Sequence, residues 1–236
     1  MRRVNRENWG YPIGASQRPC TFFSALIALA LVFSGACANA QNSETRALSR
    51  LIDSDCAQLL ASSIGCERVM LLLNVDDPET ADLLIFPDHR ADDYTVPLLV
   101  ARGIAFNGQA FGAAPYFRIS EKDKLQLVSG NIGTGRSPWE QALNIAWNGQ
   151  AFVIAGFQYS THDRISSASF DCNLNLLSGE YSVEIYGEAE DREAGPKIIF
   201  SESGDSPALQ ILLADWHAFR GLPEICAGFM KLHVSD

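Results

Sequence analysis

The stretch IAWNGQAFVIAGFQYSTHDRI, residues 145–165, decides the fold that this sequence predicts. Apolar and aromatic runs flank Asn148-Gly149, the dipeptide that best tolerates the positive φ angles of a tight turn. Aromatic and β-branched residues in such runs favour strands. The stretch therefore predicts a hairpin of two strands, residues 143–147 and 151–159, closed by that turn.

The second strand of this hairpin is apolar on both faces. Strict alternation places residues 152, 154, 156 and 158 on one face and residues 151, 153, 155, 157 and 159 on the other. Phe152 and Ile154 make the first face apolar, and Val153 and Phe157 do so for the second. A strand that is buried on both faces lies inside a sheet, so we expect a central hairpin.

A similar stretch, IAFNGQAFGAAPYF, lies 41 residues upstream, at 104–117. By the same argument, Asn107-Gly108 predicts a second hairpin. An offset of this size is typical of propeller blades and other repeated β units. The echo indicates either a duplicated unit or two independently similar hairpins, and both alternatives stay open.

The remainder of the chain predicts one helix followed by strands. Apolar residues recur at helical spacing over 43–63, and Gly65 follows as a stop signal. After Cys66, short apolar runs alternate with turn residues, as in antiparallel sheets. We expect a single, mostly β domain over 41–236, folded as an antiparallel sandwich, a barrel or a partial propeller-like sheet, with one N-terminal helix at about 43–63.

The N-terminus has the pattern of a secretory signal peptide. Four arginines precede the apolar run FFSALIALALVFSG, and the small residues ACANA follow it. Ala38 and Ala40 occupy the A-x-A positions, so we expect residues 1–40 to be a signal peptide that is cleaved before Gln41. The apolar run is short for a membrane span, and an uncleaved anchor is the alternative. We expect an exported protein, periplasmic or extracellular, with no membrane span after cleavage.

The chain is acidic, with 28 acidic and 18 basic side chains. Removal of residues 1–40 takes away four arginines and one glutamate, which leaves a net charge of −13. Such a surface repels phosphate backbones, so nucleic acid is not expected as a partner. It would attract a cationic envelope protein, although acidity also serves solubility alone.

Four cysteines remain after cleavage: Cys56, Cys66, Cys172 and Cys226. An even number in an exported chain predicts disulfide bonds, and nearness in sequence favours Cys56–Cys66 with Cys172–Cys226 among the three pairings. A zinc site is the alternative. It is disfavoured because no C-x-x-C occurs and the histidines lack ligand spacing. We expect neither a metal nor a cofactor.

Residues 130–180 resemble a family of exported bacterial proteins of uncharacterised function. The shared pattern is W…NG-x-x-F-x-x-x-G-F-x-Y-S-x-x-D-R, followed by an N-L-L-S/T-G element. The matching residues are Trp139, Gly149, Phe152, Gly156, Tyr159, Ser160, Asp163, Asn175, Leu176 and Gly179. Glu180 stands where those proteins have a basic residue, which disfavours anion binding at this turn. The resemblance implies export and assigns no activity.

The segment STHDRI, residues 160–165, holds the densest group of reactive side chains. The candidate binding residues in and beside it are Tyr159, His162, Asp163 and Arg164. A nucleophilic triad needs such groups to converge, but alternation separates His162 from Asp163, and no G-x-S-x-G motif occurs. A turn that is stabilised by its own side chains is the favoured interpretation.

Two other kinds of motif point to loops rather than sites. The glycine-rich GNIGTGR at 130–136 lacks the Lys-Ser/Thr ending of a phosphate loop, which favours a hairpin connection. The acidic runs at 76–79, 88–93 and 188–193 lack the register of a calcium loop.

No catalytic residue is assigned. The sequence favours a non-enzymatic, secreted periplasmic or envelope domain that binds or interacts with a partner. The alternative is a periplasmic hydrolase whose site is assembled from residues distant in sequence.

Overall fold

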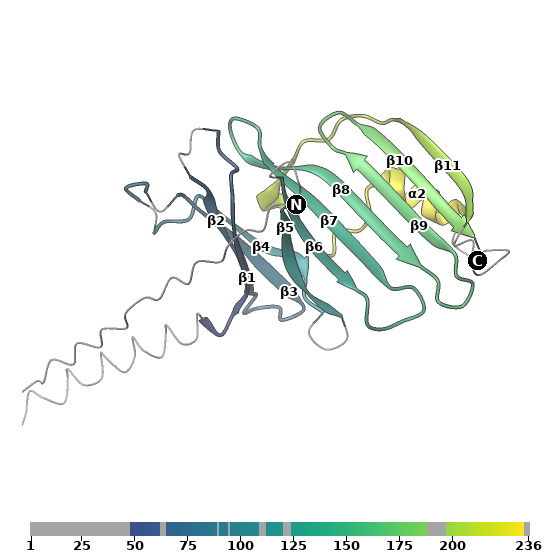
Figure 1. Cartoon of the computed structure of the whole chain (residues 1–236), viewed down its shortest axis with the longest axis horizontal. Coiled ribbons are helices and arrows are strands. Elements are labelled where there is room, and N and C mark those ends of the chain that lie inside the picture. The colour runs from purple at the N-terminus through teal and green to yellow at the C-terminus, as the bar shows by residue number, and fades with distance from the viewer. Residues whose placement is uncertain are drawn as a thin grey trace, which may run out of the picture. The chain divides into compact units, whose positions relative to one another are not determined.

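The computed structural model describes residues 48–61, 65–88, 90–93, 95–108, 112–119, 124–187 and 197–233 (Figure 1). All of them lie in one compact unit, Arg46–Asp236. The predicted signal peptide, residues 1–40, lies outside the described residues. Within the described ranges, no helix is long and apolar enough to cross a membrane.

Four strands form a small antiparallel sheet in the order β1-β2-β3-β4. The strands are β1 (Leu51–Ala57), β2 (Glu67–Leu73), β3 (Thr80–Phe86) and β4 (Leu99–Phe106). Alternate residues such as Val69 and Leu71 in β2, or Leu83 and Ile85 in β3, are fully buried. The two-residue period of these strands therefore directs one face of the small sheet to the core.

The second, larger sheet is a meander in which each strand pairs antiparallel with its neighbour in the chain. Its strands are β5 (Ala113–Ile119), β6 (Leu125–Asn131), β7 (Trp139–Trp147), β8 (Phe152–His162), β9 (Ser169–Asn175), β10 (Glu180–Gly187) and β11 (Lys197–Asp205). A two-residue strand, β12 (Ile211–Leu212), pairs with Val153 and Ile154 at the start of β8.

Both sheets contribute to one hydrophobic core, which includes Leu71 and Ile85 from the small sheet and Leu143 and Phe157 from the large one. Two helical elements follow the strands: the 3-10 turn η1 (Leu213–Asp215) and the helix α2 (Glu224–His233). The helix covers the core face of the large sheet near β9–β11 (Figure 1), where Phe229 lies between other aromatic rings. One face of the large sheet is thereby buried.

The predicted mainly β, antiparallel fold is confirmed. Of the arrangements that the sequence left open, the two sheets correspond to the sandwich-like one. The duplicated unit does not appear in the described strands. Residues 104–117 include the last residues of β4, which lies in the small sheet, and the first residues of β5, which lies in the large one. Residues 145–165, by contrast, form a hairpin within the large sheet.

The predicted N-terminal helix at about 43–63 is wrong over Leu51–Ala57, which is strand β1. Non-local contacts override the helical spacing. The strand pairs with β2, and the backbone N–H groups of Leu59 and Leu60 donate to the carboxylate of Glu67 at 2.7 and 3.1 Å. Helix α2, near the C-terminal end of the described residues, begins directly after Pro223.

The hairpin at Asn148-Gly149 is confirmed, and it is central, with β6 and β9 flanking β7 and β8. Gly149 has a φ of +99°, and the side-chain Oδ1 of Asn148 accepts from the N–H groups of Gln150 and Ala151, both at 2.9 Å. The predicted hairpin at Asn107-Gly108 is wrong. This dipeptide begins the connection from β4 to β5, which lie in different sheets.

A β-bulge interrupts the central hairpin. Ile154 pairs with Ile145 and Gly156 pairs with Asn144, so Ala155 has no partner on β7. The extra residue moves every later side chain of β8 to the opposite face. Phe157 therefore joins Ile154 in the core, and the strict alternation predicted from the sequence is wrong beyond Ala155.

Both predicted disulfide bonds are confirmed: Cys56–Cys66 and Cys172–Cys226. The first joins β1 to the residue before β2. The second joins β9 to α2, with both cysteines fully buried. Disulfide bonds of this kind are typical of oxidising, exported environments.

We expect the central hairpin to be the most sensitive part of the fold. Phe152 is 5% exposed and belongs to the core, whereas His162 is exposed at the end of β8. Phe152→Ala should lower the free energy of unfolding by about 3–5 kcal/mol, and His162→Ala by less than about 1 kcal/mol. Urea denaturation of both variants measures the difference, and equal small losses would contradict the account.

Loss of the long-range disulfide should cost more stability than loss of the short one. Cys172–Cys226 closes 54 residues and Cys56–Cys66 closes 10. Chain-entropy arguments give about 4 kcal/mol for the longer loop and about 3 kcal/mol for the shorter one. Denaturation of the two double-alanine variants without reductant tests this order, and the reverse order would contradict it.

Candidate functional site

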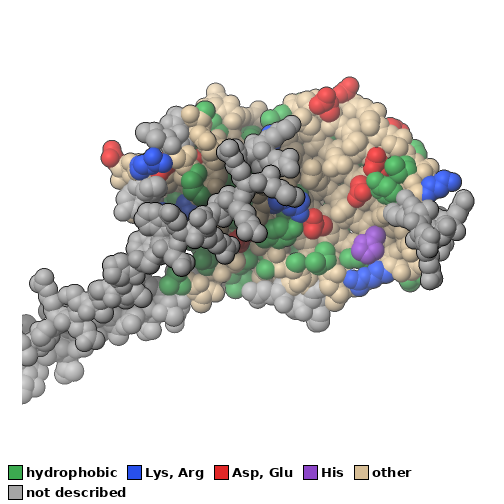
Figure 2. All heavy atoms as spheres, in the orientation of Figure 1, with side chains coloured by type: hydrophobic (Ala, Val, Ile, Leu, Met, Phe, Trp, Pro, Cys, Tyr) green, Lys and Arg blue, Asp and Glu red, His purple; other side chains and the backbone are tan. Residues whose placement is uncertain are grey.

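The face of the large sheet opposite the core is lined by polar side chains that lie in rows across the strands. We call it the polar face and define it by nine residues: Glu140, Asn144, Gln158, Ser160, Asp171, Asn173, Asn175, Ser182 and Glu184. In the view of Figure 2, tan atoms of polar side chains and backbone predominate over the large sheet, with red carboxylates among them. None of the nine belongs to the hydrophobic core.

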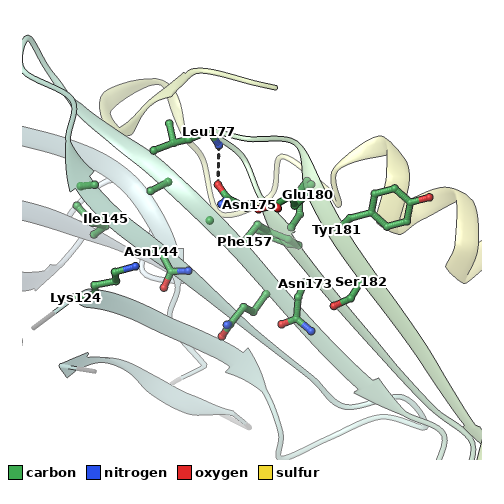
Figure 3. A pocket seen from close by; sticks show the side chains of 15 residues that line it. Lys124, Asn144, Ile145, Phe157, Asn173, Asn175, Leu177, Glu180, Tyr181 and Ser182 are labelled. Carbon is green, nitrogen blue, oxygen red and sulfur yellow. Dashed lines mark hydrogen bonds between the residues drawn. The ribbon is translucent and has the colours of Figure 1, made fainter. Parts of the chain in front are cut away.

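Two adjoining hollows lie on the polar face. The larger has a volume of about 570 Å³ and is lined by residues such as Asn144, Asn175 and Ser182 (Figure 3). The smaller has a volume of about 230 Å³ and is lined by acidic residues and Ser160. Gln158 and Asn173 line both, so the two hollows share a wall.

Gly156 makes room for the Asn144 side chain, and both residues line the larger hollow. It lies between Asn144 and Asn175 in the strand register. A Cβ atom at this position would approach the Nδ2 atom of Asn144 to 2.5 Å. A side chain here would therefore displace the Asn144 amide.

The amide side chains of the polar face differ in their hydrogen bonds. The Oδ1 atom of Asn144 accepts from Gln126 at 2.8 Å, and Oδ1 of Asn175 accepts from the backbone of Leu177, as the dashed line in Figure 3 shows. Among the described residues, the side chains of Gln158 and Asn173 make no hydrogen bond. Their donors and acceptors at the shared wall are thus available to a ligand.

The smaller hollow is acidic. Asp171 and Glu184 are cross-strand partners, and burial, followed by the charge of Glu184, raises the pKa of the Asp171 carboxyl. Glu184 accepts a hydrogen bond from the hydroxyl of Tyr186, which raises the pKa of that tyrosine to about 12. Glu140 forms an exposed ion pair with Arg118, in which the closest N and O atoms are 3.4 Å apart. Within the described part of the chain, Asp171 and Glu184 have no cationic partner.

The structure does not bring together the four candidate residues that the sequence singled out. Tyr159 lies on the core face, where its ring stacks with Phe157 and burial raises its pKa. His162 is exposed at the end of β8. The carboxylate of Asp163 accepts from the backbone N–H groups of the two residues that follow Arg164, at 2.7 and 3.1 Å.

Side-chain hydrogen bonds join the segment STHDRI to the glycine-rich loop GNIGTGR. Arg136 donates to Asp163 through Nε at 2.6 Å, and the guanidinium of Arg164 donates to the carbonyl oxygens of Ile132 and Gly135 at 2.9 and 3.2 Å. These contacts join the β6–β7 and β8–β9 connections. Both motifs thus have a structural role in the turns, which is the interpretation that the sequence favoured.

No group of three or more His, Cys, Asp or Glu side chains in the described ranges is arranged to hold a metal ion. In the first acidic run, Asn74 Oδ1 accepts from the backbone N–H of Asp76 at 2.9 Å, as in a self-stabilised turn. His89 and the run at 188–193 lie outside the described residues.

Sequence reasoning missed the polar face. A signal was present, because EYSVEIY at 180–186 and SFDCNLN at 169–175 alternate polar and apolar residues. Such alternation indicates strands with one solvated face. What the sequence hid was the bulge at Ala155, which puts Gln158 on the opposite face from Phe152 and Ile154, and the β8–β9 register, which pairs Gln158 with Asn173.

Comparisons with known proteins give no match for this chain, whether with family models, with curated proteins or with solved structures. The resemblance of residues 130–180 to exported bacterial proteins therefore stays a prediction.

We expect the ion pair between Arg136 and Asp163 to be visible by titration. Hydrogen bonding to Arg136, and then to the backbone N–H of Ile165, lowers the pKa of Asp163 to about 2. Because the pKa is lowered, the stabilisation from the pair is complete at pH values above the ordinary aspartate pKa. It is lost as the pH falls through about 2. NMR of the carboxyl carbon measures this midpoint.

Arg136→Gln is the matched variant for this titration. Its Asp163 midpoint should move up towards the ordinary value of about 3.9. An unchanged midpoint would show that the loops are not held by this pair.

Proposed function

We propose that this protein is an exported, non-enzymatic binding domain and that its ligand lies on the polar face of the large sheet. The observation that carries the proposal is the shared wall of the two hollows, where Gln158 and Asn173 have unused hydrogen-bonding groups. Gln158 is half-buried and Asn173 is exposed, so in the free protein their amides bind water, which a ligand can replace. A ligand that pairs with them accounts for their position.

The ligand of this domain carries positive charge. The polar face presents the carboxylates of Asp171 and Glu184, and the described residues supply them with no cation. The predicted mature chain has a net charge of −13, which draws cationic partners to the whole molecule. A cationic envelope protein fits both features, and inhibition of a cationic wall-degrading enzyme is one form that this binding takes.

The periplasmic or extracellular location is part of the proposal. It is supported by the N-terminal pattern of residues 1–40 and by the two disulfide bonds, which reducing compartments disfavour. In such a location, wall and envelope proteins are the available partners.

A hydrolase is the second candidate function, because the structure now places carboxylates from separate strands around one hollow. Glu140 and Asp171 lie on either side of Ser160 in one row, so their backbones are separated by two strand spacings, about 10 Å. The raised pKa of Asp171 suits a general acid, and the separation leaves room for a water between two carboxylates. Binding is favoured over hydrolysis because Glu140 is already held by Arg118.

Replacement of Gln158 by arginine should abolish partner binding. The larger side chain fills the shared wall of the hollows and neutralises their charge. The measurement is capture from an envelope extract on immobilised mature protein, with the bound proteins identified. Wild-type bait should retain basic proteins at low salt and lose them at high salt, as a charge-steered interaction requires.

Gln150→Arg is the matched control, because Gln150 is exposed in the β7–β8 turn, away from the hollows. This variant should retain the same proteins as wild type. Equal capture by wild-type and Gln158→Arg bait would contradict the proposal. Turnover of a wall polymer that Asp171→Asn removes would favour the hydrolase instead.

A further inference from the structure

The dipeptide Asn-Gly occurs twice in the chain, at Asn107-Gly108 and at Asn148-Gly149, with almost the same neighbours. The two sequences are AFNGQAF, residues 105–111, and AWNGQAF, residues 146–152. Asparagine deamidates most readily before glycine, because glycine has no side chain to obstruct attack by its own backbone nitrogen. Since the local sequences match, a difference in reactivity between the two sites comes from the fold.

Deamidation needs no reactant other than solvent. The backbone nitrogen of Gly149 loses its proton to base and attacks Cγ of Asn148, so that an N–Cγ bond forms and negative charge develops on Oδ1. The Cγ–Nδ2 bond then breaks, and Nδ2 takes protons from solvent and leaves as ammonia. Water opens the resulting succinimide ring to aspartate or isoaspartate. In sum, water is consumed and ammonia is released in equal amounts.

The turn at Asn148 favours this reaction. Asn148 and Gly149 are exposed, and the space beside Gly149 is open. Among the described residues, neither the N–H of Gly149 nor the Nδ2 group of Asn148 donates a hydrogen bond. The Oδ1 atom of Asn148 accepts from the N–H groups of Gln150 and Ala151, both at 2.9 Å. Two donors on an oxygen that becomes charged lower the barrier, as in an oxyanion hole.

The fold opposes the same reaction at Asn107. This residue is 3% exposed, and its Nδ2 atom donates to the carbonyl oxygen of Pro78 at 3.0 Å. The N–H of Gly108, which would have to attack, donates to the carbonyl oxygen of Ala113 at 3.4 Å. The Oδ1 atom of Asn107 is buried and has no hydrogen-bond partner among the described residues. Negative charge that develops on this oxygen would therefore be buried without compensation.

We infer that Asn148 is a site of spontaneous deamidation in the native protein and that the fold protects Asn107. This inference does not depend on the proposed function. The aspartate product keeps the turn, because its carboxylate accepts from the same N–H groups. The isoaspartate product inserts a methylene group into the backbone before Gly149. This group lies inside the loop that the N–H of Asn148 and the carbonyl of Ala151 close at 3.1 Å, so it disturbs the end of the central hairpin.

Peptide mapping measures both sites in the same digest. Tryptic cleavage after arginine places Asn107 in the peptide 103–118 and Asn148 in the peptide 137–164. The mature protein is incubated at neutral pH in its folded state and, in parallel, reduced and unfolded in guanidinium chloride. Mass spectrometry follows the replacement of NH₂ by OH in each peptide over time. Fragmentation of the second peptide distinguishes Asn148 from Asn144, which precedes isoleucine and should stay unmodified.

In the folded protein, Asn148 should deamidate about tenfold faster than Asn107 or more, since one hydrogen bond to a developing charge has an effect of this size on a rate. In the unfolded chain, the matched sequences should give nearly equal rates, and the rate at Asn148 should be no higher than in the folded protein. Equal rates at the two sites of the folded protein would overturn the inference. A folded-state rate at Asn148 below its unfolded value would also overturn it, because the turn would then protect this residue.

Discussion

The rest of the structure depends on the pairing of β7 with β8 and on its one irregularity, the unpaired Ala155. Before the bulge, Phe152 and Ile154 face the core; after it, Phe157 does. Without the extra residue, every side chain of β8 beyond this point would change face. The bulge therefore lets one strand supply aromatic residues to the core along its whole length.

The same irregularity creates the candidate site. Because Phe157 is turned to the core, Gly156 and Gln158 lie on the polar face beside Asn144 and Asn173. Both sheet neighbours of β8 are paired, so this face is broad and central. The core face, held by α2 and the Cys172–Cys226 bond, fixes the backbone that positions these amides. Packing on one side thus preorganises hydrogen-bonding groups on the other.

Local sequence signals predicted the local parts of the fold. The Asn148 turn and the succession of short strands follow from dipeptides and apolar runs, and the disulfide pairing follows from nearness in the chain. The helix prediction for 43–63 was wrong over β1 because the conformation there is decided by distant partners, β2 and the carboxylate of Glu67. The hairpin prediction at Asn107-Gly108 was wrong because a turn dipeptide does not reveal whether the next strand joins the same sheet.

The candidate site could be predicted only in part. Alternation in β9 and β10 marks Asn173, Asp171 and Glu184 as solvated, but the sequence contains no sign of Ala155 as a bulge. The register across strands, and with it the meeting of Gln158 and Asn173, is a tertiary property. The reactive side chains of STHDRI indicated a candidate site by their chemistry. In the structure, Asp163 and Arg164 instead form hydrogen bonds that join two loops.

The most direct test of the central claim is NMR observation of the side-chain amide groups during titration with a cationic partner. The NH₂ signals of Gln158 and Asn173 should shift and exchange more slowly with solvent, because the ligand accepts their hydrogen bonds. The NH₂ signal of Gln150, in the exposed turn, should stay unchanged. Binding that leaves the signals of Gln158 and Asn173 unmoved would show that the partner lies elsewhere and would contradict the account.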